Sequence, residues 1–153
     1  MSPVPELYLL DTAILLHLVR GSELSKVVET TYDLKAVRTR PLICAVTLGE
    51  MRAFSRNLSW GAPKRARLDE IQRDLVLVGI GEDRVLDAYA ELSSTAQARG
   101  WAIFHGKNDL WVGAAARAAG ARLITTDRDF LPVRDEMHWS VDVLDATTGH
   151  LLP

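Results

Sequence analysis

The chain contains 153 residues, of which 48% are hydrophobic and 25% are charged, and its net charge is −2. This length suits one domain with its own core, and the composition excludes a disordered chain. No apolar run approaches the roughly 18 residues of a membrane helix, and residues 1–6 lack the segments of a signal peptide, so we expect a cytoplasmic protein without membrane contact.

The first predicted strand ends at an acid. The apolar run at residues 7–10 predicts a buried strand, after which a helix begins at Asp11 and ends near Gly21. Asp is among the best residue types for capping a helix, so a capping role explains Asp11 as well as a functional role does. Residues 22–38 place apolar side chains three and four apart, which predicts a helix with one apolar face.

A second buried strand is predicted at residues 42–46, and its Cys44 is expected to be a buried, inert thiol. A helix follows from Thr47 to about Asn57 and carries Glu50 in its first turn. The spacing Thr-x-x-Glu is also that of a capping box, in which Glu50 would accept a hydrogen bond from the backbone at Thr47. The sequence leaves this structural role open beside a functional one.

The next helix, predicted at residues 63–75, is basic. Lys64, Arg65 and Arg67 lie off its apolar face. Basic residues in this position usually form a solvated surface, but these three are also the best candidates in the chain for contacting phosphates. A third short strand follows at Val76–Val78.

The second half of the chain continues the alternation of helices and strands. A long amphipathic helix is predicted at residues 82–99, and a loop leads to a buried helix opened by Asn108, with Asp109 in its first turn. The fourth strand, Arg122–Thr125, ends at two threonines followed by Asp127, and the last strand is predicted at residues 141–144.

This alternation predicts an α/β fold with a mainly parallel sheet. Strand ends and helix starts then share one sheet edge, so four acids are expected to meet there: Asp11, Glu50, Asp109 and Asp127. Such a cluster raises its own pKa values unless a positive charge compensates, and oxygen ligands of this kind suit Mg²⁺ or Mn²⁺. Setting these four acids aside leaves the chain mildly basic, so an RNA partner is compatible with the net charge.

Four segments together carry a family resemblance. They read YLLDT at residues 8–12, TLGE at residues 47–50, NDLW at residues 108–111 and TTDRDF at residues 125–130. In order and spacing they resemble the four motifs of PIN domains, and with the chain length they are most similar to VapC-type toxins of bacterial toxin–antitoxin pairs. The resemblance covers essentially the whole chain and implies a single PIN-like domain at residues 1–153, folded as a three-layer α/β/α sandwich.

The resemblance implies a Mg²⁺- or Mn²⁺-dependent endoribonuclease that is inhibited by a cognate antitoxin protein and forms a homodimer. The four acids named above would bind the metal and carry catalysis, Asp129 would be an auxiliary acid, and Thr125 would orient a water or ligand. One departure lies in the first motif, which usually reads Asp-Thr-Asn. Here Ala13 replaces the Asn, which removes a polar neighbour of the site.

Three alternatives remain. Ala13 favours a PIN-like module that binds RNA or protein without cleaving. A phosphatase of the haloacid-dehalogenase type also begins with an Asp after its first strand, but it requires a second Asp two residues later, where this chain has Ala13. A PIN-type DNase is the third, because the sequence does not distinguish ribose from deoxyribose.

Overall fold

A five-stranded parallel sheet forms the centre of the protein. The computed structural model describes residues 6–36 and 40–153. The strands lie in the order β3-β2-β1-β4-β5, and every neighbouring pair is parallel. Their bounds are Tyr8–Leu10 (β1), Leu42–Cys44 (β2), Val76–Val78 (β3), Arg122–Thr125 (β4) and Val141–Val143 (β5). The parallel α/β sheet expected from the sequence is confirmed.

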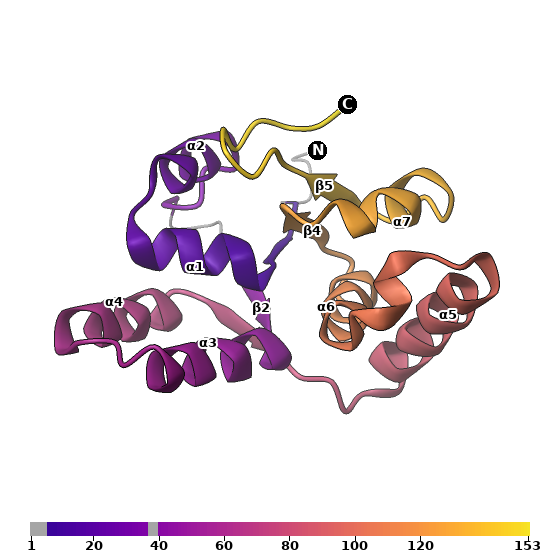
Figure 1. Ribbon diagram of the computed structural model, residues 1–153, viewed down its shortest axis with the longest axis horizontal. Coiled ribbons are helices and arrows are strands. Elements are labelled where there is room, and N and C mark those ends of the chain that lie inside the picture. Colours follow the sequence, from indigo (N-terminus) through magenta and orange to yellow (C-terminus); the bar gives the residue numbers. More distant parts are fainter. Residues whose placement is uncertain (1–5, 37–39) are drawn as a thin grey trace, which may run out of the picture.

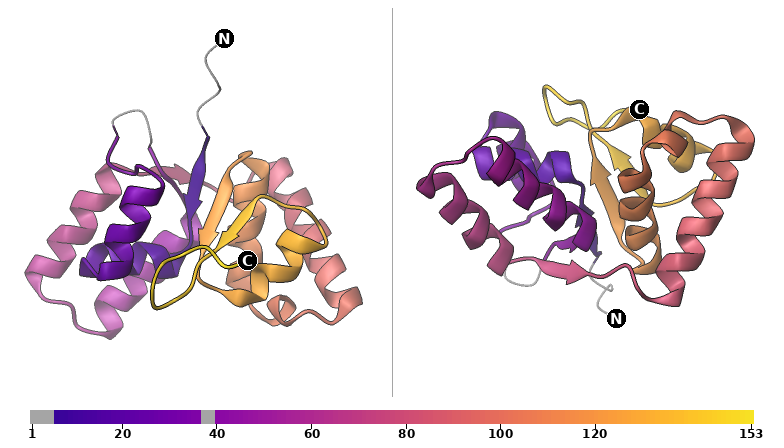
Figure 2. Two further views of the ribbon diagram at one scale, coloured as in Figure 1. Left: turned by 90° about the horizontal axis from the view of Figure 1, so that it is seen from above. Right: turned by 60° about the horizontal axis from the view of Figure 1, so that its bottom comes forward.

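Helices cover both faces of the sheet. On one face lie α1 (Thr12–Arg20), α2 (Glu23–Thr31), α3 (Ala45–Asn57) and α4 (Ala62–Arg73); on the other lie α5 (Asp83–Arg99), α6 (Lys107–Ala118), α7 (Leu131–Asp135) and the short 3₁₀ turns η1 (Ala102–His105) and η2 (Arg128–Phe130). Figures 1 and 2 show the two groups on opposite sides of the strands. The expected three-layer α/β/α sandwich is therefore observed.

Alternation along the strands supplies both cores. In β1, Leu9 packs toward α5 and α6 while Leu10 packs toward α1, and Leu123 and Ile124 of β4 divide in the same way. Successive strand residues point to opposite faces, so an apolar run of three or four residues suits a sheet that is covered on both sides. Cys44 is fully buried, and burial raises the pKa of its thiol, which agrees with the expected inert role.

Several predicted boundaries were wrong. The second strand ends at Cys44 instead of residue 46, because Ala45 already begins α3. The helix predicted at residues 22–38 ends at Thr31, and its last part, at residues 37 and 38, lies outside the described residues. The helix predicted to be opened by Asn108 instead begins at Lys107 and has Gly106 as its N-cap.

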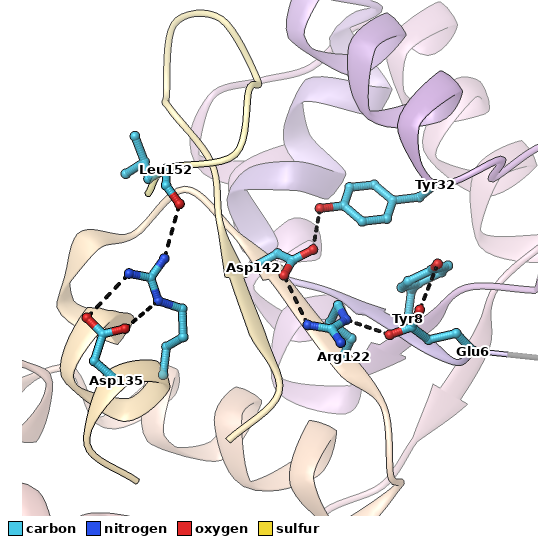
Figure 3. Close-up of polar contacts among 8 residues, drawn as sticks. Glu6, Tyr8, Tyr32, Arg122, Asp135, Asp142 and Leu152 are labelled. Carbon is cyan, nitrogen blue, oxygen red and sulfur yellow. Dashed lines mark hydrogen bonds and ion pairs between the residues drawn. The ribbon is translucent and has the colours of Figure 1, made fainter. Parts of the chain in front are cut away.

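A polar network ties α2 and the start of the chain to the sheet (Figure 3). Arg122 of β4 pairs with Glu6 and with Asp142 of β5, and the Tyr32 hydroxyl donates to the second oxygen of Asp142 at 2.7 Å. Burial and the adjacent Asp142 carboxylate raise the pKa of Tyr32. Because Tyr32 is itself buried at the end of α2, these contacts fix that helix against β5.

The C-terminal segment packs beside β5 and α7. Leu151 forms an antiparallel bridge with Leu144, and Arg134 of α7 donates to the carbonyl oxygens of Leu152 and Pro153. In the part of the chain that the structure describes, no helix is both long enough and apolar enough to span a membrane.

Candidate metal and active site

The candidate site lies where the strand order reverses direction. The chain passes from β1 outward to β2 and β3, then returns to the other side of β1 to form β4 and β5. Ligands of open α/β sheets bind at the carboxyl ends of the strands beside such a reversal. Asp11 directly follows β1, and Asp127 follows β4. The adjacent pairing of β1 and β4 therefore brings residues from distant parts of the sequence to one point.

Asp11 is the most enclosed of the four acids. It is 4% exposed, and its two oxygens accept hydrogen bonds from the Thr12 backbone at 2.7 Å and from the Thr125 hydroxyl at 2.6 Å. Burial raises the pKa of Asp11, these two hydrogen bonds oppose the rise, and the nearby Asp127 and Glu50 carboxylates add to it. Asp11 thus caps α1, as the structural alternative proposed, and also belongs to the acid cluster.

Thr12 links Glu50 to Asp11 by hydrogen bonds. The Thr12 hydroxyl lies 2.8 Å from Glu50 Oε1 and 3.1 Å from the Thr47 hydroxyl. A capping box between Glu50 and Thr47 is wrong, because α3 begins at Ala45 and Thr47 already lies inside the helix. The sequence assigned Thr47 only a capping role and assigned Thr12 no role, although both threonines lie within the motifs YLLDT and TLGE.

Asp109 and Asp127 complete the cluster. Asp109 lies in the first turn of α6, as predicted, after the short η1 turn. Burial, followed by the charges of Asp11, Asp127 and Glu50, raises the pKa of Asp109 to about 7. A Cβ added to Gly106 would lie 2.6 Å from Asp109 Oδ2, so this carboxylate occupies space that only a glycine leaves open. Nothing in the sequence singled out Gly106.

The two auxiliary residues contact the cluster through Asp127. Thr125 is fully buried, and its hydroxyl oxygen accepts a hydrogen bond from the Asp127 backbone at 3.0 Å while its proton goes to Asp11. The backbone of Asp129 donates to Asp127 Oδ1 at 2.9 Å. The Asp129 side chain is exposed. Slight burial and then the negative charge of Asp127 raise the pKa of Asp129. Thr125 therefore connects Asp11, which follows β1, with Asp127, which follows β4.

The donor set suits a hard cation, although the side chains do not enclose one. Among residues 6–36 and 40–153, no group of three or more Asp, Glu, His or Cys side chains is arranged so that it could hold a single metal ion. In the same residues none of the four acids forms an ion pair with Lys or Arg. Neighbouring carboxylates that lack a basic partner are stabilised by a divalent cation, whose preferred ligands are oxygens. The residues present fit Mg²⁺ or Mn²⁺.

The predicted phosphate-binding residues lie apart from the acids. The Lys64 ammonium lies 4.2 Å from the centre of the Trp60 ring, and Arg67 pairs with Glu70 at 3.4 Å. Arg65 is exposed. All three belong to α4, and Figures 1 and 2 place α3 between α4 and α6.

Solved structures with the same fold include members of the VapBC family of toxin–antitoxin systems. VapBC2 from Rickettsia felis, bound to a DNA fragment from its promoter, contains a chain of 19% identity and TM-score 0.75, with 91% of this chain and 99% of that chain covered. VapBC-5 from Mycobacterium tuberculosis contains a chain of 23% identity and TM-score 0.63, with 91% of this chain and 98% of that chain covered. For FitAcB from Neisseria gonorrhoeae the identity is 22% and the TM-score 0.66, with 88% of this chain and 96% of that chain covered. No curated protein matches the sequence significantly.

The family assignment rests on the sequence match. The model of the PIN domain family matches residues 8–136. This range includes the strands β1 to β4 and all four acids of the cluster. This match agrees with the fold shared with the VapBC chains. The chain belongs to the PIN domain family.

Proposed function

We propose that this protein is a VapC-like toxin that hydrolyses RNA phosphodiester bonds at a site loaded with Mg²⁺ or Mn²⁺. The observation that carries the proposal is the group of four mutually interacting carboxylates at the switch point of a PIN domain. We assign metal binding and catalysis to that group: Asp11, Glu50, Asp109 and Asp127. Asp129 is assigned an auxiliary role, and Thr125 holds Asp11 in place.

Two of these assignments, those of Asp11 and Asp109, follow from the side-chain environments. Thr12 and Thr125 hold both oxygens of the buried Asp11, so this carboxylate is the best fixed ligand. Asp109 has a raised pKa of about 7, so without a cation it carries a proton over much of the neutral range and releases it when a cation binds. A bound divalent cation supplies an activated water and stabilises the leaving oxygen.

The remaining parts of the proposal concern the setting. We infer that an antitoxin protein inhibits the site, by analogy with the toxin–antitoxin complexes whose chains share this fold. We further propose a cytoplasmic homodimer in which residues 1–153 form one domain.

Cleavage of a mixture of structured RNAs is the direct test. Purified protein is incubated with Mn²⁺ or Mg²⁺, beside an EDTA control and the Asp127→Asn variant. We expect discrete fragments that are lost in both controls, and the same assay with DNA separates a ribonuclease from a DNase. If folded, antitoxin-free protein cleaves nothing with either metal, the proposal is wrong, and the non-cleaving binding module favoured by Ala13 replaces it.

The basic residues of α4 receive a separate test. If Lys64, Arg65 and Arg67 contact the RNA backbone, replacing all three with Gln raises KM and weakens the salt dependence of binding, because fewer counterions are released. An unchanged KM and an unchanged salt dependence would mean that these three residues form an ordinary solvated surface and do not contact RNA.

A further inference from the structure

Thr12 is the residue in the site that contacts two acids through different groups. Its backbone N–H donates to Asp11 Oδ1 at 2.7 Å, and its hydroxyl lies 2.8 Å from Glu50 Oε1. Asp11 directly follows β1, and Glu50 lies in α3, the helix that follows the neighbouring strand β2, 39 positions further along the sequence. A single residue therefore contacts both acids.

The hydroxyl chemistry gives this contact a direction. A threonine hydroxyl has one proton, and an ionised carboxylate is a stronger acceptor than a second hydroxyl. The Thr12 proton therefore goes to Glu50, and the 3.1 Å contact with Thr47 is made by the Thr47 hydroxyl donating to Thr12. Thr47 is fully buried, so its hydroxyl is held in place. The result is a chain of hydrogen bonds from Thr47 through Thr12 to Glu50.

Glu50 needs such support more than the other acids do. Its side chain is longer than that of an Asp, and it projects from α3 without complete burial. Asp11 is fixed by burial and by Thr125, and Asp109 is held over Gly106. For Glu50, the hydroxyl of Thr12 is the hydrogen-bond partner found in the described residues.

We propose that Thr12 is a positioning residue that fixes the Glu50 carboxylate relative to Asp11, with Thr47 supporting the Thr12 hydroxyl. This inference rests on the proposed function as far as metal binding is concerned. The hydrogen-bond chain itself does not depend on it, which allows the two to be tested separately.

The experiment is a double-mutant cycle of Thr12→Val and Glu50→Gln, measured in two ways. Val keeps the branched shape of Thr and has a methyl group in place of the hydroxyl. We expect Thr12→Val to weaken Mn²⁺ binding about tenfold in titration calorimetry, which is the scale of losing a residue that orients a metal ligand. In the Glu50→Gln background, the same substitution should have little further effect on Mn²⁺ affinity, because Thr12 acts through Glu50.

The second measurement needs neither metal nor RNA. Urea unfolding of the four proteins in EDTA should give midpoints that are not additive, with Thr12→Val costing less once Glu50 is Gln. Thr12→Ser keeps the hydroxyl and should restore wild-type affinity, while Thr30→Val, at an exposed position of α2, controls for the substitution itself. If Thr12→Val does not fold, Thr47→Val removes the support of the chain and should weaken Mn²⁺ binding to a smaller extent.

Additive effects in both measurements would overturn the positioning role, as would a Thr12→Ser variant as defective as Thr12→Val. If the wild type binds no Mn²⁺ and cleaves no RNA while the urea midpoints remain non-additive, the proposed function fails and the link between Thr12 and Glu50 stands. An unchanged Mn²⁺ affinity in Thr47→Val would remove Thr47 from the proposal.

Discussion

Replacing Asp109 with Asn should stabilise the metal-free protein at alkaline pH. In the folded chain the pKa of Asp109 is raised from 3.8 to about 7, chiefly by burial and then by the neighbouring carboxylates. A raised folded-state pKa means that the folded protein holds the proton more tightly than the unfolded chain does. Folding is therefore progressively disfavoured as the pH rises from about 4 to about 7, and the full penalty remains above that range.

The magnitude follows from the size of the rise. A pKa increase from 3.8 to about 7 corresponds to about 4 kcal/mol, at 1.36 kcal/mol for each pH unit. Asp109 is partly exposed, so solvent screening reduces this to about 2 kcal/mol. The lost carboxylate in the first turn of α6 costs about 0.5 kcal/mol in return. We expect a net gain of about 1.5 kcal/mol at pH 8, which is a rise in Tm of about 3–6 °C for a chain of this size.

The assay is urea unfolding in EDTA at pH 8 and pH 4, followed by tryptophan fluorescence. Asp83→Asn is the matched control, because Asp83 lies in the first turn of α5 and is exposed. It should lose a little stability at both pH values. An Asp109→Asn variant no more stable than the wild type at pH 8, or equally stabilised at pH 4, would refute the electrostatic reasoning. Saturating Mn²⁺ should reverse the order, since only the wild type keeps all four proposed ligands.

Two further substitutions test the packing around the site and the far end of the sheet. Gly106→Ala places a Cβ 2.6 Å from Asp109 Oδ2, so the carboxylate must move and Mn²⁺ affinity should fall about tenfold; Gly79→Ala, where an added Cβ meets nothing within 4 Å, should leave the affinity unchanged in the same titration. Tyr32→Phe removes the hydrogen bond to Asp142 and should lower the free energy of unfolding by about 1 kcal/mol in urea, because Asp142 keeps its ion pair. If Tyr32→Phe is as stable as the wild type, the hydrogen bond to Asp142 contributes no more than the hydrogen bonds that the hydroxyl makes with water in the unfolded chain.

The error at the end of the second strand has a simple physical cause. Strands here are only three or four residues long, so an apolar run such as residues 42–46 includes the start of the next helix as well as the strand. Periodicity cannot separate the two states over so few residues. At residues 22–38 the apolar spacing continues beyond Thr31, but the helix ends there and Tyr32 turns to Asp142.

The sequence by itself determined the architecture and the candidate acids. Alternating strand and helix signals required a parallel sheet, and a parallel sheet places every strand end at one edge, so Asp11 and Asp127 could be expected together. Helix starts lie at the same edge, which added Glu50 and Asp109 to the group, and the family motifs include the same four acids. These are local patterns, each readable within a few residues.

Only the tertiary structure decided how the acids are held. The contact between Thr12 and Glu50 depends on the pairing of β1 with β2, and the contact between Thr125 and Asp11 depends on the pairing of β1 with β4. Hydrogen bonds reach only about 3 Å, so they are fixed by packing that residue spacing alone does not encode.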